Sequence, residues 1–129
     1  MSDRPTVLIV EEDGYLAGIY ARKLEMEHCK VRVVESLDEA RKKLKHLIPS
    51  VIILDVAIEN RTGFDFIEEI KGISKLKKVP IVVITQLGDK NSVKLALERG
   101  ATDYLIKGHF VPSEAAKKIK RIVYESQDQ

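Results

Sequence analysis

Residues 7–13 read Val7-Leu-Ile-Val-Glu-Glu-Asp13, an apolar run that ends abruptly in three acids. Four further runs follow along the chain: Val31 to Val34, which is interrupted by Arg32, then Val51 to Leu54, Ile81 to Ile84, and Tyr104-Leu-Ile106. Short runs rich in β-branched residues and apolar at consecutive positions are typical of strands buried on both faces of a parallel sheet. Arg32 predicts that the second strand lies at a sheet edge.

Segments with helical spacing separate these strands. Their apolar positions are Leu16, Ile19, Tyr20 and Leu24; Leu37, Ala40, Leu44 and Leu47; Phe66, Ile67, Ile70 and Ile73; Val93, Ala96 and Leu97; and Ala115, Ala116, Ile119, Ile122 and Val123. Ser36 and Glu39 form a capping-box signature, Gly100 stands where the fourth segment ends, and Pro112 suits a first helical turn. The pattern predicts an α/β fold, a five-stranded doubly wound parallel sheet of order 2-1-3-4-5 with five helices.

The chain has 129 residues, with 22 basic and 20 acidic side chains and a net charge of +2. This length predicts a single domain over residues 1–129, with a core from about residue 5 to about residue 125. Cys29 cannot close an intrachain disulfide, and no apolar run approaches the ~18 residues of a membrane span. We therefore expect a cytoplasmic protein, a monomer or weak dimer, without direct contacts to nucleic acid or membrane.

Polar residues follow each predicted strand. Those after the second strand, Glu35 and Ser36, are explained by the helix cap, and those after the other four strands are Glu11-Glu12-Asp13, Asp55, Thr85 and Lys107. The carboxyl ends of parallel strands share one sheet edge, and ligands bind there at the point where strand order reverses, between the first and third strands. Each residue alone would be an ordinary solvated loop residue, so only their joint placement is informative.

Several carboxylates in one crevice repel one another unless some are protonated or a cation is bound. An oxygen-only ligand set, without histidine or cysteine at ligand spacing, suits Mg²⁺. A lysine and a threonine at the same edge can neutralise and hydrogen-bond phosphoryl oxygens. Asp55 would then be the nucleophile that forms an aspartyl phosphate.

These residues together resemble the receiver domains of two-component response regulators, and the resemblance covers almost the whole chain. Its marks are residues 7–13, Ile52-Ile-Leu-Asp55, Gly63, Ile81-Val-Val-Ile-Thr85 and Gly100-Ala-Thr-Asp-Tyr104-Leu-Ile-Lys107. The resemblance implies a flavodoxin-like receiver fold in which Asp55 accepts a phosphoryl group from a histidine kinase or phosphotransfer protein. It also implies a Mg²⁺ site formed by Glu11, Glu12, Asp55 and the carbonyl of Ala57. Thr85 and Lys107 would contact the phosphate.

The resemblance further implies how the signal leaves the domain. Tyr104 matches the aromatic position whose rotamer follows Thr85, and the surface of the fourth helix, fifth strand and fifth helix would change and signal to a downstream protein. Such a domain is a phospho-acceptor that assists its own phosphorylation and dephosphorylation, not an enzyme acting on other substrates. The apolar Ala57 and Leu87, two residues after Asp55 and Thr85, cannot orient a water molecule, which predicts slow self-dephosphorylation.

The sequence departs from the family pattern at three places. Glu12 stands where the family mostly has aspartate, and Gly108 replaces the proline that usually follows the lysine, in a loop about one residue longer than usual. Glu59 and Arg61 occupy the loop after Asp55, where small or apolar residues are common. Glu12 and Gly108 motivate an alternative function, a receiver-like interaction module that works without phosphorylation. A flavin carrier is disfavoured, because the acids at residues 11–13 would repel a ligand phosphate.

Overall fold

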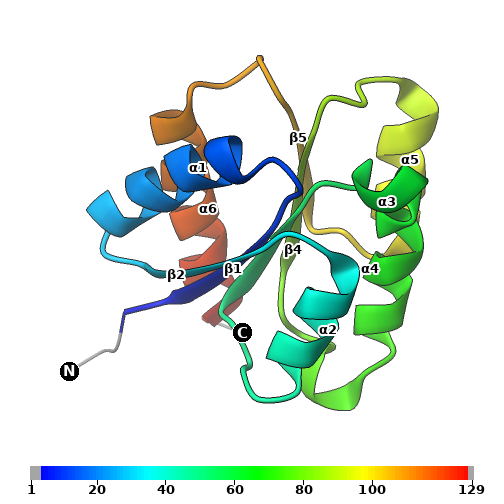
Figure 1. Ribbon diagram of the computed structural model, residues 1–129, viewed down its shortest axis with the longest axis horizontal. Coiled ribbons are helices and arrows are strands. Elements are labelled where there is room, and N and C mark those ends of the chain that lie inside the picture. The colour runs from blue at the N-terminus through cyan, green and yellow to red at the C-terminus, as the bar shows by residue number, and fades with distance from the viewer. Residues whose placement is uncertain (1–3, 128–129) are drawn as a thin grey trace.

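The computed structural model describes residues 4–127, which contain one sheet of five parallel strands (Figure 1). The strands are β1 (Thr6–Val10), β2 (Lys30–Val34), β3 (Val51–Leu54), β4 (Ile81–Thr85) and β5 (Asp103–Ile106). Their order, β2-β1-β3-β4-β5, confirms the predicted topology. Arg32 lies on the edge strand β2, as predicted, and three of the five residues of that strand are exposed.

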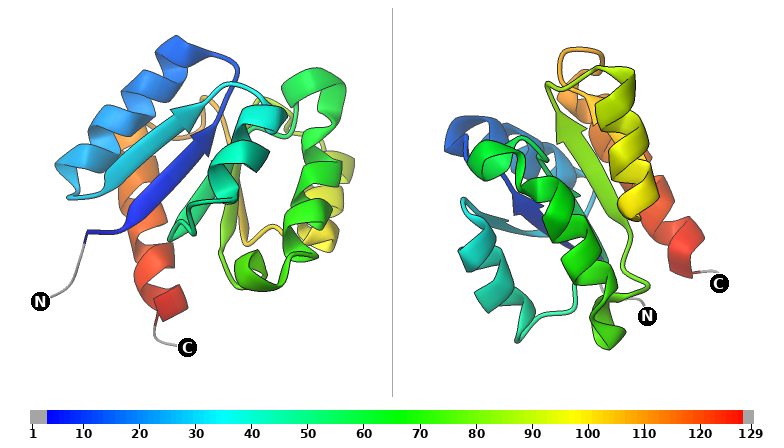
Figure 2. Two further views of the ribbon diagram at one scale, coloured as in Figure 1. Left: turned by 60° about the horizontal axis from the view of Figure 1, so that its bottom comes forward. Right: turned by 90° about the vertical axis from the view of Figure 1, so that its right-hand side faces the viewer.

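Helices cover both faces of the sheet, as the two views of Figure 2 show. The helices are α1 (Gly14–Met26), α2 (Leu37–Leu44), α3 (Ile58–Arg61), α4 (Gly63–Lys71), α5 (Lys90–Arg99) and α6 (Pro112–Gln127), with a 3₁₀ turn η1 (Ser74–Leu76). α1 and α6 pack on one face, and α2, α4 and α5 pack on the other. Within the described residues, no helix is long and apolar enough to cross a membrane.

The predicted number of helices is wrong by one. The additional helix, α3, is a single turn in which Glu59, Asn60 and Arg61 have φ values of 47°, 62° and 72°. These values lie in the left-handed region, which residues with a Cβ seldom adopt, so no helical pattern in the sequence announces the turn. Ile73, predicted as part of the third helix, lies beyond the end of α4 at Lys71.

Two apolar clusters, one on each face, hold the helices to the sheet. β3 and β4 are buried at every residue, because each lies between two other strands and under helices on both faces. The predicted caps form as well: Ser36 Oγ accepts the Glu39 N–H at 3.1 Å, and Gly100 ends α5 with a φ of 121°. These contacts fix where each strand ends, and therefore where its polar successor lies.

Candidate phospho-acceptor site

Three of the predicted site residues form a buried ion cluster at the carboxyl edge of the sheet. Lys107 Nζ lies 2.7 Å from Glu11 Oε1 and 2.8 Å from Asp55 Oδ2. Glu11 and Asp55 follow the paired strands β1 and β3, so sheet register alone brings their carboxylates together. Lys107 reaches them from the end of β5, two strands away from β3. The side chains of this cluster are only 10–13% exposed.

Burial and ion pairing act against each other in this cluster. Desolvation raises the pKa of the Glu11 carboxyl, although the hydrogen bond from Lys107 opposes the rise. Desolvation would by itself lower the pKa of the Lys107 ammonium, but its hydrogen bonds to Asp55 and Glu11 outweigh this and raise the pKa. The lysine therefore stays charged, and its charge is what allows two carboxylates to share a nearly dry crevice.

The second oxygen of Asp55 is held by its own loop. Asp55 Oδ1 accepts the Ala57 N–H at 2.9 Å, so the carboxylate is oriented by the backbone on one side and by Lys107 on the other. Gly63, at the start of α4, packs against this loop: a Cβ at Gly63 would lie 2.7 Å from Val56 Cα and 3.1 Å from the Asp55 carbonyl oxygen. The glycine is thus required by close approach, independently of its own dihedral angles.

Thr85 and Tyr104 are joined through the backbone of Leu87. Thr85 is fully buried at the end of β4, and its Oγ1 accepts the Leu87 N–H at 3.5 Å. The Tyr104 hydroxyl donates to the Leu87 carbonyl oxygen, and burial, together with the charges of Asp89 and Asp55, raises the pKa of Tyr104 to about 12. Slow self-dephosphorylation, expected from the apolar Ala57 and Leu87, stays a prediction.

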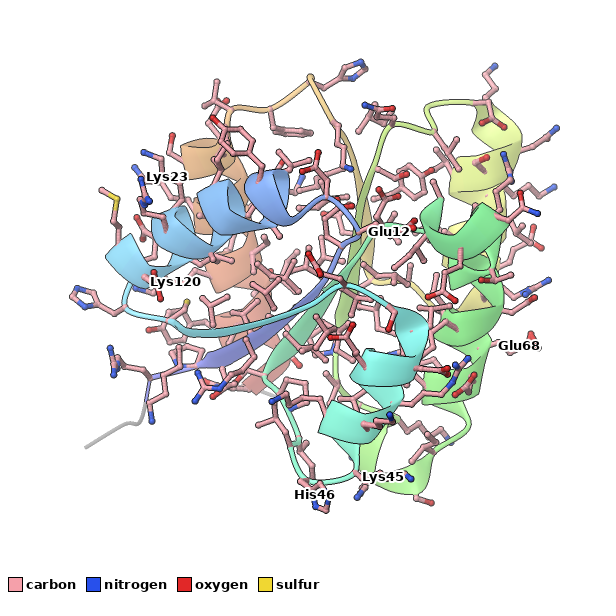
Figure 3. All side chains as sticks on the ribbon, viewed as in Figure 1. Glu12, Lys23, Lys45, His46, Glu68 and Lys120 are labelled. Carbon is pink, nitrogen blue, oxygen red and sulfur yellow. The ribbon has the colours of Figure 1, made fainter. Side chains whose placement is uncertain are left out.

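Glu12 lies outside the ion cluster, although it is adjacent to Glu11. Its Oε1 accepts the Glu59 N–H at 3.1 Å, and Figure 3 shows it at the carboxyl end of the strands, near α3. Asp13 faces away as well, because its carboxylate caps α1 by accepting the Leu16 N–H at 3.1 Å. Of the three consecutive acids, only Glu11 therefore contacts Asp55's partner Lys107.

The oxygen donors at this edge fit the chemistry of Mg²⁺. The carboxylates of Glu11 and Asp55 and the carbonyl of Ala57 are hard oxygen ligands of the kind that Mg²⁺ prefers. Within residues 4–127, however, no group of three or more His, Cys, Asp or Glu side chains is placed to hold a metal ion. Glu12 as a metal ligand stays a prediction.

The loop after Lys107 turns at the glycine that replaces the family's usual proline. Gly108 has a φ of 89°, a value that proline cannot adopt, and the His109 N–H donates to the Ile106 carbonyl at 3.1 Å. No cis peptide bond occurs among the described residues. Because a positive φ at the third position of a four-residue turn favours glycine, the local geometry accounts for Gly108.

Glu59 and Arg61, which in the sequence are only departures from a family pattern, each contact a helix in the structure. In the structure, Glu59 Oε2 accepts the Leu37 N–H of α2 at 2.7 Å, and Arg61 Nη2 donates to Ser92 Oγ of α5 at 3.1 Å. No spacing or composition signal could have found these contacts, because they depend on the left-handed turn of residues 59–61.

Comparisons with known proteins agree with this geometry. The family model of the response regulator receiver domain matches residues 7–120. The phosphate regulon transcriptional regulatory protein PhoB of Escherichia coli is 29% identical over 91% of this chain, which spans about half (51%) of that relative's length. The two-component response regulator ORR6 of Oryza sativa subsp. japonica is 31% identical over 90% of this chain and 69% of its own length.

Solved structures show the same fold. A putative response regulator from Chloroflexus aurantiacus superposes with a TM-score of 0.86 at 29% identity, covering 94% of this chain and 98% of that one. A CheY-like receiver domain protein from Methanospirillum hungatei superposes with a TM-score of 0.87 at 19% identity, covering 97% and 98%, and supports the fold alone.

Proposed function

This chain belongs to the response regulator receiver domain family, and from that premise we propose that it is a phosphorylation switch whose acceptor is Asp55. The observation that carries the proposal is the contact of Lys107 Nζ with Asp55 Oδ2 at 2.8 Å, in a crevice at the switch point of the sheet. A nucleophilic carboxylate beside a lysine is the arrangement that phosphoryl transfer needs.

In the proposed reaction, an Asp55 carboxylate oxygen attacks the phosphorus of a phosphohistidine on a histidine kinase or phosphotransfer protein. The new O–P bond forms as the N–P bond breaks, and the leaving imidazole takes up a proton. Lys107 neutralises charge on the phosphoryl oxygens, while the Ala57 N–H keeps the carboxylate oriented. The chain is thus a phospho-acceptor that assists its own phosphorylation and dephosphorylation, not an enzyme acting on other substrates.

Mg²⁺ is the proposed cofactor. Glu11, Asp55 and the Ala57 carbonyl would hold it, with Glu12 as the further ligand expected from the family pattern. When bound, Mg²⁺ supplies positive charge that offsets the carboxylates and the transferred phosphoryl group. Lys107, which lies within 2.8 Å of both carboxylates, supplies positive charge to them as well.

The proposed output is a change in the surface of α5, β5 and α6 that a downstream protein recognises. Thr85 and Tyr104 both contact the backbone of Leu87, in the loop that leads into α5. A movement of Thr85 toward a phosphoryl group at Asp55 would therefore also move Leu87 and change its contact with Tyr104. We propose a cytoplasmic location and a monomeric or weakly dimeric state, without direct contacts to nucleic acid or membrane.

Incubation with acetyl phosphate and Mg²⁺ tests the acceptor, with intact-protein mass spectrometry as the readout. We expect the wild type to gain one phosphoryl group, Asp55→Asn to gain none, and chelation of Mg²⁺ to prevent the gain. No gain in the wild type, or an equal gain in Asp55→Asn, would contradict the proposal.

An interaction module that works without phosphorylation is the second candidate. It is favoured by the hydrogen bond that Glu12 accepts from Glu59, because this carboxylate is then engaged away from the ion cluster. Binding of a partner protein that is equally tight for wild type and Asp55→Asn, with and without acetyl phosphate, would support this candidate over the switch.

A further inference from the structure

The left-handed turn, residues 59–61, connects parts of the molecule that are far apart in sequence. On one side, Glu12 Oε1 at the end of β1 accepts the Glu59 N–H at 3.1 Å, and Glu59 Oε2 accepts the Leu37 N–H at 2.7 Å. Leu37 is the first residue of α2, so the Glu59 carboxylate also lies at the positive end of that helix. The turn is thereby fixed to β1 and α2.

On the other side, the turn is fixed to α5. Arg61 Nη2 donates to Ser92 Oγ at 3.1 Å, and the guanidinium lies over the Phe64 ring, 5.4 Å from its centroid. Ser92 is only 1% exposed, and its Oγ donates in turn to Asp89 Oδ1 at 2.8 Å. Because Asp89 is the N-cap of α5, Arg61 is connected through Ser92 to the residue that starts this helix.

These contacts have to offset two unfavourable features. Three consecutive residues with side chains are held at positive φ, a conformation that L-residues avoid because Cβ approaches the following carbonyl. A cation at the N-terminus of α5 also opposes the helix dipole, although the charge of the Asp89 carboxylate partly offsets it. Local preference alone would therefore not place Arg61 at this position.

We propose that Arg61 is a positioning residue that holds the N-terminus of α5 to the loop after Asp55, with the left-handed turn as the connecting element. The proposal rests on the proposed switch function, because α5 is part of the surface that would change on phosphorylation. The hydrogen bond from Arg61 to Ser92 joins the loop after Asp55 to α5. We therefore expect its loss to change how strongly binding at Asp55 is coupled to the position of α5.

The structural part of the proposal is tested by amide hydrogen exchange without metal or phosphate. Arg61→Gln and Ser92→Ala should each speed exchange of the Val93 N–H, which donates to Asp89 in the first turn of α5, by about 3- to 10-fold, the equivalent of one hydrogen bond. The double variant should exchange no faster than Ser92→Ala alone, because Ser92→Ala already removes the partner of Arg61 together with the Ser92–Asp89 hydrogen bond.

Substitutions at Glu12, which accepts the Glu59 N–H on the other side of the turn from α5, test whether the turn connects the two sides. Glu12→Ala removes the acceptor for the Glu59 N–H and should also speed exchange of the Val93 N–H, whereas Glu12→Gln keeps an acceptor oxygen and should restore wild-type exchange. Arg41→Gln is the matched control: Arg41 likewise makes charged hydrogen bonds, to Glu69 and Asp38, and lies over a phenylalanine ring, but it does not contact α5.

The functional part is tested by titration with beryllofluoride, a phosphoryl mimic, in the presence of Mg²⁺. Arg61→Gln and Ser92→Ala should each change the affinity for beryllofluoride by about 3- to 10-fold relative to wild type, and Arg41→Gln should bind it as wild type does. Unchanged Val93 exchange in Arg61→Gln and Ser92→Ala would overturn the proposal, and so would unchanged affinity in variants that bind beryllofluoride. A wild type that fails to bind beryllofluoride contradicts the proposed switch function instead. In that case, exchange of the Val93 N–H by itself decides whether Arg61 holds the N-terminus of α5.

Discussion

The buried ion cluster (Glu11, Asp55 and Lys107) and the left-handed turn (residues 59–61) lie at the same edge of the sheet but arise in different ways. The cluster follows from strand ends: once five parallel strands are ordered, the residues that follow them lie at one edge of the sheet, where Glu11, Asp55 and Lys107 meet. The turn follows from hydrogen bonds to three distant segments, which hold the backbone in a conformation it would otherwise avoid. Sheet topology thus brings the charged side chains of the cluster together, whereas the left-handed turn connects the loop after Asp55 to α2 and α5.

Of all the substitutions in these two regions, Lys107→Met should cause the largest loss of stability, because it removes the lysine from the ion cluster. Removing the Lys107 ammonium leaves the carboxylates of Glu11 and Asp55 facing each other in a nearly dry crevice, at a cost of about 3 kcal/mol in the free energy of unfolding at neutral pH. Urea denaturation measures this cost. Adding Glu11→Gln removes one of the two charges and should recover part of the loss; a Lys107→Met variant as stable as wild type would contradict this view of the cluster.

Gly63→Ala tests the packing on which both regions depend. The new Cβ would lie 2.7 Å from Val56 Cα, and the backbone after Asp55 would have to shift, so we expect a loss of about 2 kcal/mol. Gly18→Ala in α1 is the control, since a Cβ there meets nothing within 4 Å and alanine favours the helix. Thermal or urea unfolding should show a loss of stability for Gly63→Ala and a gain for Gly18→Ala. A change of the same sign in both variants would refute the close approach at Gly63.

Asn60, the middle residue of the left-handed turn, tests the backbone conformation of that region. Its φ of 62° favours glycine over alanine, so Asn60→Ala should be less stable than Asn60→Gly by about 1 kcal/mol. Lys117, exposed in the middle of α6, should show the reverse order, with glycine less stable than alanine by about 1 kcal/mol. Urea unfolding of the four variants provides the check, and the same order at both positions would mean that the turn is not left-handed.

Tyr104 should show the smallest effect, at alkaline pH. Its pKa is raised to about 12, so between about pH 10 and about pH 12 the unfolded phenol ionises while the folded one stays protonated, and folding stability falls as the pH rises. Tyr104→Phe removes this contribution. The fall in stability from about pH 9 to about pH 11, followed by urea unfolding, should be smaller in Tyr104→Phe than in wild type. An equal fall would mean that Tyr104 titrates normally.

The sequence predicted the strands, their order and the meeting of Glu11, Asp55 and Lys107, because apolar runs and parallel-strand ends follow from simple periodicity. It did not separate the roles of three consecutive acids: Glu11 enters the cluster, Glu12 accepts from Glu59, and Asp13 caps α1. Those roles depend on where each side chain points after the strand ends, which no periodicity encodes.

The turn was missed for a related reason. Positive φ at three successive residues with side chains has no sequence signature, since the usual marker of such a conformation is glycine. The partners of Glu59 and Arg61, Leu37 and Ser92, lie more than twenty residues away and become neighbours only in the folded chain. Glu59 and Arg61 could be seen as unusual for the loop, but their contacts could not be predicted.

Amide chemical-shift mapping with Mg²⁺ and beryllofluoride tests whether Asp55 is the acceptor of a phosphorylation switch. We expect shifts around Asp55 and Ala57, at Thr85 and Leu87, and across the surface of α5, β5 and α6, all of them absent in Asp55→Asn. An unchanged wild-type spectrum at saturating Mg²⁺ and beryllofluoride, or the same shifts in Asp55→Asn, would contradict the assignment of Asp55 as the acceptor of a phosphorylation switch.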